Sequence, residues 1–364
     1  MHLFFVFLTK NKTLKHLLIR NTLYFIGLSA VLFSCGSSKN VTPQNKNLPV
    51  NKNKTTNLPP KTQTTGVQTQ TKPPVQKEHG VEFYTRNIAD ISKNDNTISY
   101  GSIVTAKPMG YEVTKNYFPS IGQNFRQRYL ILHYTALNND RSIFALTQQG
   151  LSAHYLVNDI DDKEIYQIVD ENKRSYHAGV SSWRKDSNLN DTSIGIEISN
   201  MGFTTDASGQ RVFADFPDYQ FRKVAALAKD IVQRYNIPPT NVLAHSDIAP
   251  TRKQDPGPKF PWKRLYDEYQ IGMWYDDSTR AALLTQIESG NFESERNTPP
   301  FIYKVQSQLQ ALGYAIDLSG QWDNQTKLVI QAFQYHFWPL IGDGVLDTGT
   351  YATLLALIQK YPSK

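Results

Sequence analysis

A break in composition near residue 77 limits which parts of this chain can fold. Between residues 36 and 77, 32 of 42 residues are Thr, Lys, Asn, Pro or Gln, and none is aromatic or acidic. Such a segment cannot bury enough apolar surface to offset the conformational entropy that is lost on ordering. We therefore expect a disordered tether at residues 35–77 and a folded body from residue 78 onward.

The basic excess of the chain lies in its first part and not in the folded body. The 364 residues include 39 Lys and Arg against 32 Asp and Glu, a formal charge of +7. Residues 1–77 hold 11 of the basic residues and no acidic residue, so the body has 28 basic and 32 acidic residues, a net charge of −4. Because nucleic-acid binding needs a basic folded face, no nucleic-acid partner is expected.

The amino terminus has the features of a targeting segment. Four basic residues up to Arg20 precede an uncharged run at residues 23–33, and the only cysteine, Cys35, follows. Eleven residues span about 16 Å as a helix, which is short of the roughly 20 residues that a bilayer crossing needs. The sequence LFSCGSS resembles a bacterial lipoprotein signal, which implies a signal peptide at residues 1–34 and lipidation of Cys35. The alternative is an ordinary secretory signal beside a coincidental cysteine.

Strand and helix patterns in the body predict an α/β (α+β) fold with a mixed central β-sheet flanked by helices. YLILHYTA (129–136) is typical of a buried strand, and SIGIEIS (193–199) alternates so that Glu197 lies opposite the isoleucines. DYQFRKVAALAKDIVQRYNIP predicts an amphipathic helix with Asp218 as its N-cap. VLAHSDIAPTRKQDPG then changes from a short strand into a polar loop.

Two histidines and one aspartate are candidate metal ligands. A single cysteine excludes an internal disulfide framework and a multi-cysteine metal cluster, so metal chemistry must use His and carboxylates. His133 and His245 each end an apolar strand, and Asp255 follows ten residues after His245 in a loop able to fold back. Taken singly, a strand histidine is more commonly a core residue, but this combination suits a catalytic zinc ion with one open position. Lys253 precedes Asp255 by two residues, so an extended segment would project both side chains the same way.

Five separated motifs resemble a known family. FPSIGQNFRQRYLILHYTA, SAHYLV, YHAGVSSW, LNDTSIGIEISN and LAHSDIAPTRKQDPGPKFPW are similar, in order and spacing, to zinc-dependent N-acetylmuramoyl-L-alanine amidases of the AmpD and AmiD type. The resemblance covers roughly residues 100–270 and implies a zinc amidase domain, which we place at residues 78–275. It implies one Zn²⁺ ion with the ligands His133, His245 and Asp255.

The same resemblance implies roles for further residues. Glu197 would be the catalytic carboxylate, and Lys253 would stabilise the developing oxyanion. Residues that would line or brace the substrate cleft are His154, His177, Trp183 and Asn190. Without the resemblance, Glu197 and Lys253 would be ordinary polar positions of a strand and a loop, and Trp183 a packing residue.

A smaller helical unit is predicted at residues 299–364, after a connector at 276–298. Apolar residues recur at helical spacing, Asp323 and Asp347 are candidate N-caps, and GDG at 342–344 marks a turn. The runs LQALGY, WDNQTKLVIQAFQ and GDGVLDTGTYATLLAL resemble a three-helix peptidoglycan-binding module. A merely structural helical cap is the alternative.

Together these features predict an envelope enzyme that cleaves the amide between N-acetylmuramic acid and L-alanine. Its expected partners are peptidoglycan or muropeptides, and the membrane through a lipid anchor at Cys35, placed in the outer membrane and facing the wall. It is expected to be a monomer. Two alternatives stay open: a peptidoglycan-recognition protein that does not hydrolyse its ligand, and a zinc endopeptidase that cuts within the stem peptide.

Overall fold

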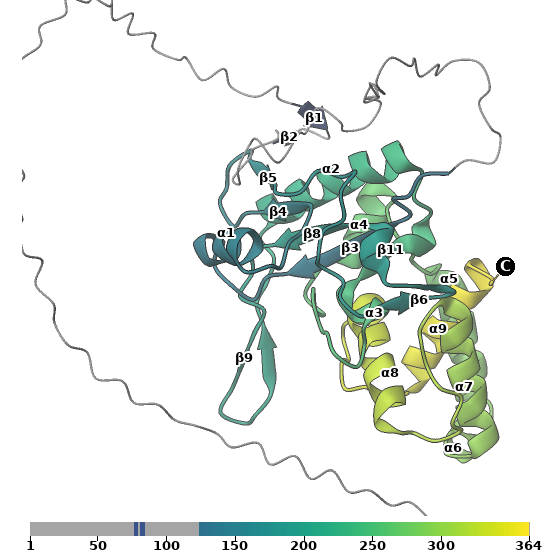
Figure 1. The fold of residues 1–364 in the computed structure, drawn as a ribbon. Helices are drawn as coiled ribbons and strands as arrows, with labels where there is room; N and C mark the ends of the chain where they lie inside the picture. The colour runs from purple at the N-terminus through teal and green to yellow at the C-terminus, as the bar shows by residue number, and fades with distance from the viewer. Residues whose placement is uncertain (1–75, 79–80, 84–123, 364) are drawn as a thin grey trace, which may run out of the picture. The chain divides into compact units, whose positions relative to one another are not determined.

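The computed structural model describes residues 76–78, 81–83 and 124–363 (Figure 1). The predictions made for residues 1–34, for Cys35 and for most of the tether lie outside these residues. The first described elements, β1 (Gln76–Glu78) and β2 (Val81–Phe83), pair as an antiparallel hairpin. Among the helices of the described residues, none combines the length and the apolar composition that a membrane span requires.

A five-stranded mixed sheet forms the centre of the region before the C-terminal helices and confirms the predicted fold class (Figure 1). Neighbouring strands in this sheet are parallel except for the pair β4 and β5. In spatial order, the strands are β11 (Val242–Ala244), β3 (Tyr129–Tyr134), β8 (Ser193–Ile198), β4 (Tyr155–Val157) and β5 (Ile165–Gln167).

Three helices accompany the sheet: α1 (Asn139–Gln148), α2 (Asp218–Tyr235) and α4 (Trp262–Tyr269). The apolar stripe predicted for α2 is buried, from Phe221 through Ile231. The predicted N-cap of α2 is wrong by one residue, because Pro217 precedes the helix and Asp218 is its first residue. The Asp218 carboxylate pairs with Arg264 (2.7 Å) and Arg222 instead of capping a backbone N–H group.

Shorter elements lie in the connections between these strands and helices. Two hairpins pair β6 (Ser182–Trp183) with β7 (Asp186–Ser187), and β9 (Phe203–Thr205) with β10 (Arg211–Phe213). The β9–β10 hairpin extends away from the sheet (Figure 1). Two 3₁₀ turns lie at Leu189–Asp191 and Pro239–Asn241, and a single helical turn, α3 (His245–Ile248), follows β11 directly.

The C-terminal region is helical, as predicted. It contains α7 (Pro299–Leu312), α8 (Asn324–Phe337) and α9 (Thr348–Lys360). The expected N-caps are present, since Asp323 accepts from the Thr326 N–H group at 2.7 Å and Asp347 caps α9 in the same way. The expected connector forms two further helices, α5 (Asp277–Glu288) and α6 (Phe292–Glu295). The sequence of α5 carries no clear apolar stripe, and none of its residues is buried.

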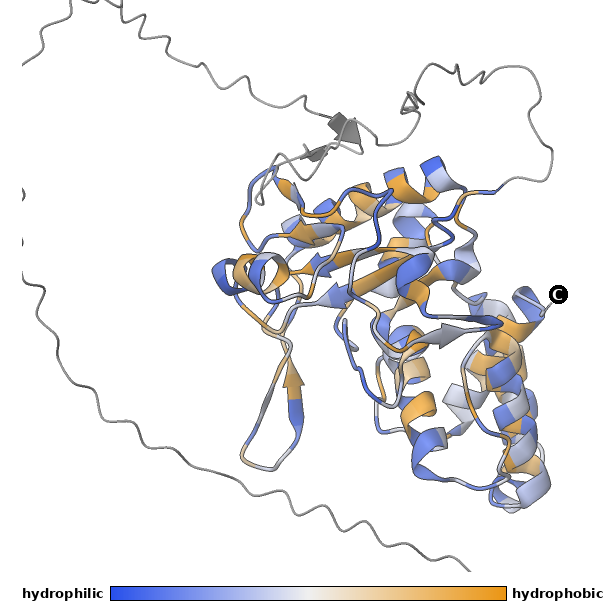
Figure 2. Cartoon of the chain, in the orientation of Figure 1, coloured by the Kyte–Doolittle hydropathy of each residue, from blue (hydrophilic) through white to orange (hydrophobic). Residues whose placement is uncertain are grey.

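The apolar core continues from the sheet into the C-terminal helices. Figure 2 shows apolar residues along the central strands. Buried side chains of both regions belong to one cluster, in which the rings of Trp183 and Tyr314 meet edge to face at 5.0 Å. The backbone N–H of Arg184 donates to the Gly313 carbonyl at 2.7 Å. The C-terminal helices are therefore packed directly against the region that contains the central sheet.

Candidate metal and catalytic site

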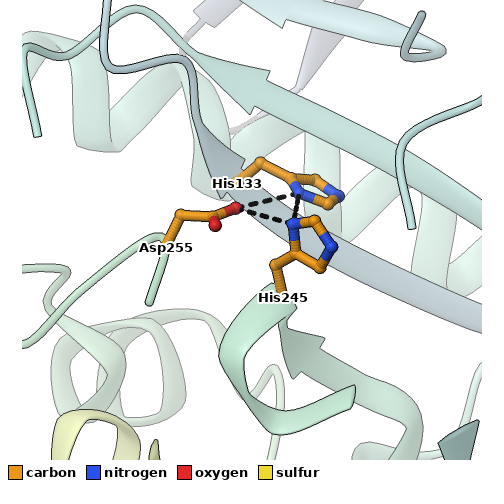
Figure 3. A group of neighbouring side chains, drawn as sticks. All are labelled: His133, His245 and Asp255. Carbon is orange, nitrogen blue, oxygen red and sulfur yellow. Dashed lines mark hydrogen bonds and ion pairs between the residues drawn. The ribbon is translucent and has the colours of Figure 1, made fainter. Parts of the chain in front are cut away.

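The three predicted ligands converge at the carboxyl ends of two adjacent parallel strands (Figure 3). His133 lies near the end of β3, and His245 begins α3 directly after β11. Asp255 lies in the loop beyond α3, which folds back because the Ser246 N–H group donates to the Asp255 carbonyl at 3.0 Å. In open α/β sheets this edge is the usual place for a ligand.

The distances within this cluster are short. The Nδ1 atoms of His133 and His245 lie 2.9 Å apart, and Asp255 Oδ2 lies 3.1 Å from the first and 3.0 Å from the second (Figure 3). All three side chains are buried. Among the residues that the structure describes, this trio is the cluster of His, Cys, Asp or Glu side chains suited to holding a metal ion.

The tautomer of His245 follows from one contact. Its Nε2 atom lies 3.1 Å from the Ala178 carbonyl oxygen, which only accepts hydrogen bonds. The Nε2 atom of His245 must therefore carry the hydrogen and donate it. In the neutral ring this leaves a lone pair on Nδ1, which points toward His133 and Asp255.

The tautomer of His133 follows from a longer chain of contacts, which we call the histidine relay: His133, His177, Ser193 and the Leu189 carbonyl. Ser193 Oγ–H donates to the Leu189 carbonyl at 2.5 Å, so Oγ accepts from His177 Nε2–H at 3.1 Å. The Nδ1 atom of His177 is then an acceptor, and His133 Nε2–H donates to it at 2.9 Å. His133 Nδ1 is left with a lone pair, like His245 Nδ1.

Three acceptor atoms thus face one another within 3.1 Å, an arrangement that is favourable when a cation lies between them. Burial, and then the neighbouring His245, lower the pKa of His133 to about 4, so the ring is neutral at pH 7. The donor set fits Zn²⁺, whose tetrahedral ligand atoms lie about 3.3 Å apart for bonds of about 2.05 Å.

Glu197 lies beside the cluster without belonging to it. It pairs in register with His133 across the parallel strands β3 and β8, so both side chains project from the same face of the sheet. Its Oε2 atom is buried and has no hydrogen-bond partner within the described part of the chain. Burial, and then the Asp255 charge, raise the pKa of Glu197 to about 8, while the half-buried Lys253 opposes this shift. A carboxyl group with one such oxygen and a pKa near neutrality is suited to accept and return a proton.

The four residues expected to line or brace the cleft are all buried and bind the protein itself. His154 accepts from the Gly195 N–H group at 3.0 Å, and Trp183 Nε1–H donates to the Thr240 carbonyl at 3.0 Å. Asn190 Oδ1 accepts from the N–H groups of His177 (3.1 Å) and Ala178 (2.7 Å), so it supports both the relay and the carbonyl that orients His245.

Two functional positions were missed by the sequence reasoning. Ser193 links His177 to the Leu189 carbonyl in the histidine relay, but a single serine at the start of a strand carries no local signal. Ala178 acts through its carbonyl group, which any residue possesses. A third position, Gly195, is visible in the sequence as a glycine within a strand. A Cβ atom at this position would lie 2.5 Å from the His177 ring. Only glycine fits there without displacing the relay.

Comparison with known families gives two matches. The model of the family described as N-acetylmuramoyl-L-alanine amidase matches residues 123–258, and that of a peptidoglycan binding domain matches residues 298–354. N-acetylmuramoyl-L-alanine amidase AmiD of Escherichia coli is 40% identical over 243 residues, which are 65% of this chain and 84% of AmiD. The 1,6-anhydro-N-acetylmuramyl-L-alanine amidase AmpD of Enterobacter cloacae is 39% identical over 117 residues, 32% of this chain and 56% of AmpD. The chain thus spans only about half the length of AmpD.

Two solved structures resemble the chain over both of its regions. One is the complex of Escherichia coli AmiD with anhydro-N-acetylmuramic acid-L-Ala-D-γ-Glu-L-Lys, with a TM-score of 0.63 and 36% identity, covering 71% of this chain and 99% of AmiD. The other is AmpDh3 of Pseudomonas aeruginosa in complex with an anhydromuramic pentapeptide, with a TM-score of 0.62 and 41% identity, covering 70% of this chain and 100% of AmpDh3.

Proposed function

Because this chain belongs to the family of N-acetylmuramoyl-L-alanine amidases, we propose that it works with one zinc ion held by His133, His245 and Asp255. One observation carries the proposal: three buried acceptor atoms converge within 3.1 Å, and each imidazole has its other nitrogen committed as a donor. The bond cleaved is the amide between N-acetylmuramic acid and L-alanine. When bound, zinc supplies Lewis acidity toward the amide carbonyl and lowers the pKa of a water molecule.

The protein groups have separate tasks in this reaction. Glu197 takes the proton of the attacking water through its unpaired carboxylate and then returns it to the leaving amine of L-alanine. Lys253 brings a positive charge to the same site, and its ammonium group stabilises the negative charge that develops on the carbonyl oxygen. The buried Glu197 Oε2 atom, which has no hydrogen-bond partner among the described residues, favours hydrolysis over a recognition protein that only holds its ligand.

The substrates that we propose are peptidoglycan or muropeptides. The match of residues 298–354 to a peptidoglycan binding domain supports this, as do the muramoyl peptides bound to the similar AmiD and AmpDh3 structures. We further propose that the mature protein is a monomer anchored by a lipid at Cys35, located in the cell envelope, in the outer membrane and facing the wall. The lipoprotein-like sequence LFSCGSS supports the anchor.

Product analysis tests the proposed reaction. Purified protein incubated with peptidoglycan should release peptides with free L-alanine amino termini, detected by mass spectrometry. A chelator should abolish this release and added zinc should restore it, while His133→Ala should stay inactive in both conditions. Cleavage within the stem peptide, or full activity after chelation, would contradict the proposal.

A further inference from the structure

A buried carboxylate connects the metal-ligand turn α3 to the C-terminal bundle. Asp247 is the third residue of α3, two positions after His245, and is completely buried. Its Oδ2 atom accepts from the backbone N–H of Ala244 at 2.8 Å, which fixes the start of α3. Two more hydrogen bonds reach the same carboxylate from the C-terminal helical region, whose helix α8 lies beside α3 (Figure 1).

The first donor is Tyr314, which follows α7. Its hydroxyl donates to Asp247 Oδ1 at 2.6 Å, and its side chain is buried against Trp183. The turn before it is tightly packed, since a Cβ atom on Gly313 would lie 2.4 Å from the Trp183 ring. The position of the Tyr314 hydroxyl is therefore set by rigid contacts on both sides of the interface.

The second donor is His336 on α8, whose Nδ1–H group donates to Asp247 Oδ2 at 2.6 Å. Its ring is stacked on Trp262 of the catalytic domain and on the adjacent Phe337, with ring centroids 3.9 Å apart in both pairs. His336 is buried, so this contact is shielded from water. Hydrogen bonds to a buried carboxylate are short and strong, and loss of a donor leaves a charge without compensation.

Two of the three groups that hold Asp247 thus come from outside the catalytic domain, and Asp247 in turn holds the turn that presents His245. We propose that Tyr314 and His336 are positioning residues for the metal ligand His245. The C-terminal bundle then contributes to metal binding as well as to any contact with the wall. This inference rests on the proposed zinc site.

Zinc affinity of the full-length protein tests this role. Zinc dissociation constants, measured by competition with a chromophoric chelator, should rise about tenfold in Tyr314→Phe and in His336→Leu, the lower end of the range for changes behind a metal ligand. His336→Asn keeps a donor near the former Nδ1 position and should restore most of the affinity. The visible spectrum of the cobalt-substituted protein should change in the first two variants, because it reports the geometry of the ligands.

A matched control separates positioning from general stability. Gln306 is buried inside the bundle, where its amide donates to Thr326 Oγ1 (2.8 Å) and Ser319 Oγ (3.0 Å). Gln306→Leu should lower the melting temperature while leaving the zinc dissociation constant within about twofold of wild type.

Equal zinc affinity in wild type, Tyr314→Phe and His336→Leu would refute the positioning role, as would an equal loss of affinity in Gln306→Leu. Failure of the wild-type protein to bind zinc at all would refute the proposed metal centre and this inference with it. The two failures are therefore distinguishable.

Discussion

The histidine relay makes a prediction about zinc affinity. His177→Phe keeps a ring of similar size but removes the Nδ1 acceptor, so His133 Nε2–H loses a hydrogen bond of 2.9 Å in a buried site. A buried donor without a partner costs about 1–3 kcal/mol. At about 1.4 kcal/mol for each tenfold change, zinc affinity should fall by roughly 5- to 150-fold. This range includes the 10- to 100-fold losses that are typical when a group behind a metal ligand is removed.

The assay is a competition titration of zinc between the metal-free protein and a chromophoric chelator at pH 7. His177→Asn is the matched control, because its Oδ1 atom lies near the former Nδ1 position and accepts the same hydrogen. It should recover most of the lost affinity, and Ser193→Ala should fall between wild type and His177→Phe. If His177→Phe binds zinc within about twofold of wild type, the reasoning about the relay is refuted.

Four further predictions concern the chemistry and packing of the site. Glu197→Gln should keep zinc affinity within about twofold while turnover falls by about 10²- to 10⁴-fold in assays of L-alanine release, and loss of metal would instead make Glu197 a ligand. Lys253→Ala should lose about 100-fold in turnover, equivalent to about 3 kcal/mol, and near wild-type turnover would remove it from the mechanism. In the metal-free protein, burial lowers the pKa of His133 from 6.5 to about 4. As the pH falls, the unfolded chain therefore protonates His133 before the folded protein does, and the free energy of unfolding decreases between pH 6.5 and pH 4. Urea unfolding at pH 7 and pH 5 should show a larger decrease in the free energy of unfolding for wild type than for His133→Asn. Equal decreases would contradict the lowered pKa of His133. Gly195→Ala would bring a Cβ atom to 2.5 Å from His177 and should destabilise the fold by about 1–3 kcal/mol in the same assay; unchanged stability would show that the ring moves freely.

Local patterns predicted much of the fold. Period-two alternation located β3 and β8, because strand side chains alternate between the faces of a sheet whatever the rest of the chain does. Asp323 and Asp347 were identified as N-caps because a cap bonds a backbone N–H group only three residues further along the chain. The prediction failed for Asp218, whose carboxylate pairs with Arg222 of α2 and Arg264 of α4 and does not cap the helix.

The metal-ligand trio could be proposed from its chemistry, but its geometry could not. His133 and Asp255 are 122 residues apart in sequence, so the 3.1 Å between them depends on the pairing of β3 with β11 and on the fold-back of the loop after α3. The motifs indicated which residues to consider. The sheet then determined that Glu197 lies in register with His133, beside the cluster and not within it.

What the sequence alone determined is the set of chemical groups and the local conformations that present them. What only the tertiary structure decided is how distant groups constrain these side chains: a carbonyl of Leu189 that dictates which nitrogen of His133 is bare, and a carboxylate of Asp247 held by the bundle. The physical reason is that strand periodicity and helix capping depend on neighbours in sequence, whereas tautomers and buried charges depend on neighbours in space.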